Sequence, residues 1–169
     1  LSTRMKAVGE VMAIGSTFEE AMQKAMRSLE QGHAGLGADG HDDFDEEAFE
    51  EKVATPTPER ILYVAEALRR GWGVERVFEL TRIDQWFLHR IQDIVTAEGR
   101  IRELGLSGMD AAHMLAAKQM GFSDAQIGHL TGQRDDTVRA VREVLGVRPL
   151  VKTVDTCAGE FASRTSYHY

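Results

Sequence analysis

Apolar residues recur every three or four positions from about residue 58 to residue 147, and glycines interrupt this pattern at short intervals. Such a period is that of an amphipathic helix, and glycine is common directly after the last residue of a helix. Nothing in the stretch alternates with the period of two that a half-buried strand shows. The pattern therefore predicts an all-α fold: a compact multi-helix domain, with short extended or strand segments at both ends.

The longest helical pattern begins near residue 83 and ends at Gly105. Its apolar positions are Ile83, Phe87, Ile91, Ile94 and Ile101, with Trp86 and Val95 beside them. Further helices are predicted over 59–70, 74–80, 109–120, 124–131 and 135–145, the first with Ile61, Leu62, Ala65 and Leu68 on its apolar face. C-terminal caps are expected at Gly105, Gly121, Gly132 and Gly146.

The start of the chain has a different pattern. Residues 9–14 are predicted to form a short strand. Thr17 and Glu20 then have the spacing of a capping box, and the helix that follows is expected to end near Glu30. A strand and a helix without partner strands resemble the edge of a larger domain, so we expect this end to belong to a neighbouring domain.

Two further segments flank the helical region. A short helix is predicted over 45–54, with Phe49 and Val53 pointing inward. Residues 151–155 are predicted to be extended. We expect the second segment, like the start of the chain, to lead into a neighbouring domain.

The negative charge is concentrated in one segment. Residues 39–52 contain eight acids and one base, a net charge of −7, which equals the formal charge of the whole chain. The acids are Asp39, Asp42, Asp43, Asp45, Glu46, Glu47, Glu50 and Glu51. Binding to nucleic acid and to anionic membranes depends on clustered Lys and Arg. Because the other 19 acids and 19 bases cancel, the charge pattern disfavours both kinds of partner.

Apolar runs and cysteine usage favour the cytoplasm. No uncharged apolar run approaches the roughly 20 residues that a membrane-spanning helix needs. Cys157 is the one cysteine, so the chain forms neither an internal disulfide nor a cysteine-rich zinc site. Such usage is typical of a reducing compartment, and we expect a cytoplasmic protein.

No set of residues predicts catalysis. The 6 histidines are scattered, and no two stand four residues apart, the spacing that places two imidazoles on one helical face for zinc. Residues 39–45 are rich in carboxylates, but Phe44 stands where an EF-hand loop needs glycine, so we expect a solvated acidic loop or lid there. Cys157 has no neighbouring base. We therefore predict no catalytic, cofactor-binding or metal-ligating residue, and expect that the chain alone is not an enzyme.

One motif suggests a different function. Residues 121–132 followed by 136–142 resemble a helix-turn-helix, with Ile127 and Leu130 inward and Gly132 at the turn. The candidate reading helix balances three bases against three acids, and two of the acids lie in its first turn, where they would face phosphate. A stand-alone DNA-binding regulator is therefore the alternative hypothesis, and structural packing is the favoured explanation of the motif.

Large aromatic side chains gather in the helical region. Aromatic residues commonly anchor protein contacts. The interface candidates are Tyr63, Trp72, Trp86 and Phe87. In a domain without a predicted catalytic site, self-association is the function to test.

Four segments resemble the large subunit of carbamoyl phosphate synthetase. Residues 5–30 resemble the end of its first ATP-using half. Residues 77–88 (Val-Phe-Glu-Leu-Thr-Arg-Ile-Asp-Gln-Trp-Phe-Leu) resemble a motif of its central helical region, and Gly-Phe-Ser-Asp at 121–124 falls at a similar turn. Residues 154–161 (Val-Asp-Thr-Cys-Ala-Gly-Glu-Phe), with Tyr167 and Tyr169, resemble the start of the second ATP-using half. The segments occur in the family's order, which covers almost the whole chain.

The resemblance implies a middle part of a longer ligase subunit. Its two ATP-grasp halves would phosphorylate bicarbonate and then carbamate, using glutamine-derived ammonia and ATP with Mg²⁺ or Mn²⁺, for arginine and pyrimidine synthesis. The implied divisions are 1–31 (edge of the first half), 32–57 (acidic linker), 58–150 (helical oligomerisation domain) and 151–169 (start of the second half). Residues 32–57 follow no family pattern, and Gly159 stands where alanine is usual.

The same resemblance implies a role without chemistry. The family's ATP-, metal- and bicarbonate-contacting motifs have no counterpart in this chain, so it implies no catalytic residue and no cofactor here. The implied function is that of a non-catalytic helical spacer and oligomerisation domain. Its implied partners are other large subunits and, in the parent complex, a small glutaminase subunit.

Overall fold

The computed structural model describes residues 10–162 and 164–169, and its regular structure there is helical apart from one isolated β-bridge. The helices are α1 (Phe18–Ser28), α2 (Phe49–Ala54), α3 (Arg60–Arg69), α4 (Val74–Thr81), α5 (Gln85–Gly108), α6 (Ala111–Gln119), α7 (Asp124–Thr131) and α8 (Asp135–Val144). The predicted all-α class is confirmed, and each helix overlaps a range predicted from the sequence.

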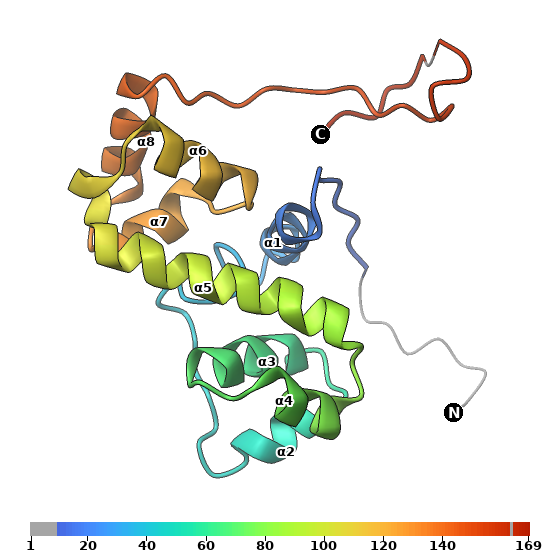
Figure 1. Ribbon diagram of the computed structural model, residues 1–169, viewed down its shortest axis with the longest axis vertical. Helices are drawn as coiled ribbons and strands as arrows, with labels where there is room; N and C mark the ends of the chain where they lie inside the picture. Colours follow the sequence, from blue (N-terminus) through green and yellow to red (C-terminus); the bar gives the residue numbers. More distant parts are fainter. Residues whose placement is uncertain (1–9, 163) are drawn as a thin grey trace.

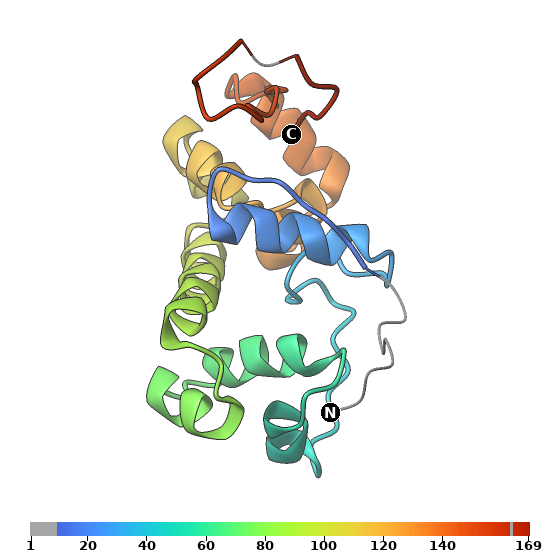
Figure 2. The same cartoon turned by 90° about the vertical axis from the view of Figure 1, so that its right-hand side faces the viewer.

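Helix α5 connects two groups of helices (Figure 1). The group α2–α4 packs against its first half, and α7, which also contacts α8, packs against its second half. Helix α1 lies beside α5, and the segment from α1 to α2 passes between the two groups (Figure 2). The C-terminal segment leaves α8, and its end returns toward α1, where the ammonium of Lys24 lies 5.6 Å from the centre of the Tyr169 ring (Figure 1).

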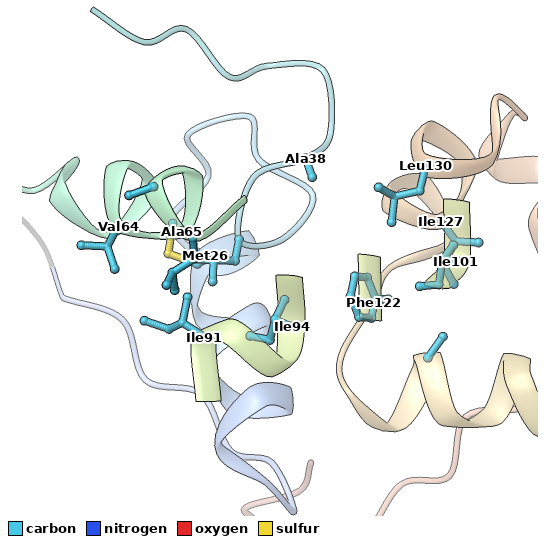
Figure 3. Packing of buried hydrophobic residues seen from close by; sticks show 14 of the residues in the cluster. Met26, Ala38, Val64, Ala65, Ile91, Ile94, Ile101, Phe122, Ile127 and Leu130 are labelled. Atoms are coloured by element: carbon cyan, nitrogen blue, oxygen red, sulfur yellow. The ribbon is translucent and has the colours of Figure 1, made fainter. Parts of the chain in front are cut away.

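Residues of α5 form the middle of the hydrophobic core. Ile91 and Ile94 lie near Val64 and Ala65 of α3, and Ile101 lies near Phe122 and the residues of α7 (Figure 3). The spacing of three, four and seven residues along α5 places its apolar side chains on one face. One helix thereby contributes to the core of both groups.

The burial pattern departs from the predicted stripe at the start of α5. Ile83 precedes the helix, which Asp84 caps by accepting a hydrogen bond from the N–H of Trp86 at 2.8 Å. Leu88 is fully buried, whereas Phe87, which shares the helical face of Ile91, is exposed. The cause is tertiary, because Phe87 meets Phe18 of α1, at 5.5 Å between ring centroids, and Trp86 instead of the core.

Helix α3 is buried on more of its circumference than its predicted stripe. Tyr63, Val64 and Ala67 are buried in addition to Ala65 and Leu68, because α2, α4 and α5 all contact this helix. The predicted members Ile61 and Leu62 are only partly buried.

The strand predicted over 9–14 is not formed within the described residues 10–14, and residue 9 lies outside them. A strand needs a partner to pair its backbone groups, and the part of the chain that the structure describes offers no sheet. At the other end, Thr153, which lies in the segment 151–155 predicted to be extended, forms an antiparallel bridge with His168, which lies outside that segment.

Caps and turns follow the sequence signals closely. The hydroxyl of Thr17 accepts a hydrogen bond from the N–H of Glu20 at 3.2 Å and caps α1. Gly132, with φ of 67°, ends α7 in the left-handed conformation that glycine adopts without strain. Gly105, predicted as a cap, has φ of 60° and ψ of 167° and interrupts the helical conformation as predicted, but a second helical stretch follows across the kink as far as Gly108.

Residues 39–45 were expected to form a solvated loop, which holds for Gly40, His41, Asp43 and Asp45 but not for Asp39. Leu36, Ala38 and Asp39 are buried, and the loop before α2 is packed between the helix groups. Side chains satisfy its backbone: the Nε2 of Gln126 donates to the carbonyl of Gly37 at 2.9 Å, and the Oε1 of Gln23 accepts from the N–H of Leu36 at 3.2 Å. A loop is buried without penalty only when its backbone groups are paired in this way.

Candidate functional site

An exposed aromatic cluster lies at the start of α5 and consists of Phe18, Trp86 and Phe87. Trp86 is 54% exposed and Phe87 is 43% exposed. The Trp86 ring meets Phe87 edge to face at 5.0 Å between centroids and meets Phe18, at the start of α1, at 5.5 Å. Phe18 therefore supports two large rings that face solvent.

Charged side chains border the aromatic cluster. The guanidinium of Arg90 lies 5.9 Å from the centre of the Trp86 ring, and its Nη1 lies 3.3 Å from the Oε1 of Glu19. The Nη2 of Arg90 lies 3.0 Å from Asp93. Exposed aromatic rings with a charged rim are the composition of protein-contact hot spots.

The two other aromatic candidates pack inside the chain. Tyr63 is buried, and its hydroxyl accepts a hydrogen bond from the N–H of Asp45 at 3.1 Å. Trp72 is half-buried: its ring stacks edge to face on Phe49 at 5.7 Å, and the guanidinium of Arg76 lies 3.6 Å from its centre. In this chain both side chains hold α2 against α3 and α4.

Arginines neutralise part of the acidic segment. Arg70 forms two hydrogen bonds with Glu46, of 2.6 and 2.7 Å, and its guanidinium lies 4.0 Å above the Phe49 ring. Arg76 bonds Glu50 at 2.8 Å. The acids of α2 and of the residues before it therefore attach this short helix to the domain.

The helix-turn-helix motif is a packed hairpin. Ile127 and Leu130 point inward as predicted, and the N–H of Gln126 donates to the capping hydroxyl of Ser123. Arg142, on the candidate reading helix α8, is largely buried and bonds Asp124 of α7. Arg134 bonds Asp136. With these arginines engaged inside the chain, nothing supports the DNA-binding alternative.

One group of metal-ligand residue types meets among the described residues: His33, Asp39 and Asp42. Sequence reasoning weighed residues 39–45 as a calcium loop and did not join His33 to them, because only the folded turn brings it near. The histidines were compared only with the four-residue spacing of ligands on a helix, and that spacing does not identify ligands that a loop brings together. Cys157 is half-buried, and the N–H of its backbone donates to Asp155 at 2.9 Å.

Together, these features define an all-α protein-contact domain. The aromatic cluster is exposed on its surface, and within the described residues no helix has the length and apolarity to cross a bilayer. The chain belongs to the family "Carbamoyl-phosphate synthetase large chain, oligomerisation domain", and the model of that family matches residues 10–146.

Similar proteins agree with this membership. The chain is 49% identical over 172 residues to a carbamoyl phosphate synthase large chain of Xylella fastidiosa. It is 48% identical over 171 residues to one of Pseudomonas aeruginosa, and 49% identical over 174 residues to one of Rhizobium meliloti. Each match covers 100% of this chain but only 15 to 16% of the relative. The chain therefore spans about a sixth of the length of the curated relatives it matches.

Proposed function

We propose that the chain joins copies of a carbamoyl phosphate synthase large chain through the aromatic cluster. The observation that carries the proposal is the exposure of Trp86 and Phe87 side by side on one helix end. Membership in an oligomerisation-domain family supports self-association. Of the four candidates from the sequence, Trp86 and Phe87 would form the contact, while Tyr63 and Trp72 would hold α2 in place.

A symmetric contact fits the charges at the rim. In a two-fold dimer, the same patch of each copy faces the other, so the patch has to be complementary to itself. Arg90 and Glu19 are 3.3 Å apart at the edge of the cluster and supply both signs. Each could pair with the opposite charge of the second copy while the rings pack at the centre, where water is excluded.

The remaining assignments concern a longer large chain. We propose that residues 58–150 form the oligomerisation domain, 32–57 an acidic linker attached to it, and 1–31 and 151–169 the borders of two ATP-using halves. The relatives, about six times longer than this chain, support its being part of a longer one, and the family match over 10–146 takes in residues 10–57 as well as the helical region. The whole protein would be a cytoplasmic ligase that uses ATP with Mg²⁺ or Mn²⁺ and pairs with a small glutaminase subunit. The chemistry would belong to residues outside this chain.

Sedimentation velocity of the chain tests the contact. Trp86→Glu and Phe87→Glu each place a carboxylate in the proposed interface, so we expect the self-association of the parent to be lost while circular dichroism keeps its helical signal. Leu115→Glu, at a 46% exposed position of α6, is the matched control and should associate as the parent does. A parent chain that stays monomeric, or folded variants that associate unchanged, would contradict the proposal.

A further inference from the structure

A tight turn after α1 gathers one histidine and two carboxylates. Gly37, Ala38 and Gly40 all have left-handed φ, of 73°, 53° and 85°, and this backbone folds Asp39 and Asp42 to the same side. One ring nitrogen of His33 and one carboxylate oxygen from each aspartate lie within 4.8 Å of one another. The group lies outside the aromatic cluster and has no part in the proposed association.

We propose that His33, Asp39 and Asp42 bind one divalent transition-metal ion, for which Zn²⁺ is the best match. An imidazole with two carboxylates is a donor set that Zn²⁺ accepts with bonds of roughly 2.0–2.2 Å. Tetrahedral bonds of that length place neighbouring ligand atoms about 3.3–3.5 Å apart. The Nδ1 of His33 lies 3.3 and 3.5 Å from the two oxygens of Asp39, so this pair already has the required separation.

One carboxylate oxygen of this group has no hydrogen-bond partner. The Oδ1 of Asp42 is buried and accepts no hydrogen bond, although the Oδ2 of the same carboxylate accepts one from the N–H of Ala38 at 2.6 Å. Burying an unpaired carboxylate oxygen is unfavourable. A cation between His33, Asp39 and Asp42 would supply the missing partner.

The charge of the site favours a cation as well. The side chain of Asp39 is 1% exposed and that of His33 is 10% exposed. The guanidinium of Arg69 reaches this turn, but it bonds Glu98 and the carbonyl of Leu36. Its Nη1 lies 3.5 Å from the Oε2 of Glu66 and forms no hydrogen bond with Asp42. The buried Asp39 and the half-buried Asp42 therefore face one imidazole and one arginine that other acids already bind, and a divalent ion would balance the remaining charge.

Backbone groups hold the ligands in position. Asp39 accepts hydrogen bonds from the N–H groups of Ala34 at 2.6 Å and His41 at 3.1 Å, which orients its carboxylate without using all its lone pairs. Such outer partners fix the ligands of protein metal sites. A cavity of about 190 Å³, lined by His33, His41, Asp42 and Asp43 among others, gives an ion access and leaves room for water as a further ligand.

Isothermal titration of the chelator-treated chain with ZnCl₂ tests the site. We expect one ion per chain, with affinity lowered at least tenfold by His33→Gln and by Asp42→Asn. Cobalt(II) should show visible absorption bands of a low-symmetry nitrogen and oxygen site in the parent and lose them in the variants. The control is His113→Gln, because His113 also contacts an aspartate, Asp110 at 2.8 Å, but on the surface. It should bind zinc as the parent does.

Folding is checked separately. Asp42→Asn weakens the hydrogen bond from the N–H of Ala38, which could lower stability. His33→Gln removes a contact with Asp39 alone, so it should fold and decides the test. Zinc should raise the melting temperature of the parent and of His113→Gln, and leave that of His33→Gln unchanged. Absence of zinc binding to the parent, or equal affinity in folded His33→Gln, would overturn the proposal and leave a buried water as the partner of Asp42.

Discussion

Arg69 of α3 and Glu98 of α5 form a buried ion pair with two hydrogen bonds. The Nε of Arg69 donates to the Oε2 of Glu98 at 2.8 Å, and its Nη2 donates to the Oε1 at 2.9 Å. Burial raises the pKa of Glu98 above its ordinary value, and the hydrogen bonds and charge of Arg69 offset part of this rise. The same Nη2 also donates to the carbonyl of Leu36, so the pair joins α3, α5 and the loop.

Glu98→Gln should lower the free energy of unfolding by about 3 kcal/mol, because it removes the carboxylate that accepts two hydrogen bonds from the buried Arg69 and leaves Glu66, 3.5 Å from its Nη1, as the paired acid. Urea unfolding followed by circular dichroism measures this change. Glu103→Gln, at an exposed position of the same helix, is the control and should change stability by less than about 0.5 kcal/mol. A similar small change for Glu98→Gln would show that the pair contributes little.

Gly35→Ala should destabilise the fold although its backbone needs no special conformation. A Cβ at residue 35 would lie 2.3 Å from the Oε1 of Gln126 and 2.4 Å from the Oε1 of Gln23. Because both amides are buried and hold the loop, we expect a loss of about 1–3 kcal/mol from overpacking. Thermal unfolding measures the loss.

Gly99→Ala is the matched control for this substitution. Residue 99 is in α5, and a Cβ there would have no atom within 4 Å outside its own helix turn. Alanine in a helix interior is favoured over glycine by about 0.5–1 kcal/mol, so the control should be more stable than the parent. A Gly35→Ala chain as stable as the parent would mean that the loop moves aside without cost.

Local signals in the sequence predict the helices well. Thr17 and Gly132 mark helix ends through hydrogen bonds and φ angles that depend on neighbouring residues alone. Phe49 and Val53 were predicted inward and are buried, because a six-residue helix with two apolar side chains four apart has one face to bury. The interruption at Gly105 was predicted, but the helical stretch that continues to Gly108 was not, since glycine occurs both at caps and at kinks.

The loop and the exposed aromatics follow from long-range packing instead. Gln23 and Gln126 bond loop backbone 13 and 89 residues away, and no periodic pattern announces such contacts. Phe87 shares a helical face with the core residue Ile91 and differs from it only in what covers that end of α5. The sequence therefore identifies the large aromatic residues as interface candidates, but only the tertiary structure shows that Tyr63 is buried and Trp86 is exposed.

Arg70→Lys should loosen α2. Lysine has neither the two parallel donors that bond Glu46 nor the planar group that stacks on Phe49. We expect faster hydrogen exchange at the amide of Lys52, which bonds the carbonyl of Ala48, while the amides of α5 stay protected. Arg148→Lys, at an exposed position after α8, should leave exchange in α2 unchanged. Unchanged exchange in Arg70→Lys would show that burial of Phe49 alone holds α2.

Asp124 should make the α7–α8 hairpin sensitive to acid. Burial alone would raise the pKa of this carboxyl, but hydrogen bonds from Arg142 and Lys118 outweigh burial and hold the pKa below its ordinary value of 3.8. A lowered pKa in the folded state means that the unfolded chain binds the proton more readily. The contribution of Asp124 is thus complete at pH 7 and is lost as the pH falls below about 4.

Asp124→Asn removes this contribution and leaves Arg142 and Lys118 without their shared counter-charge. Because Asp124 is 13% exposed, part of the charge is screened, and we expect a loss of about 2 kcal/mol at pH 7. Urea midpoints of parent and variant should differ clearly at pH 7 and converge toward pH 3, whereas Glu143→Gln, an exposed change on α8, should follow the parent at both values. A difference that persists at pH 3 would mean that the carboxylate acts through packing rather than through its charge.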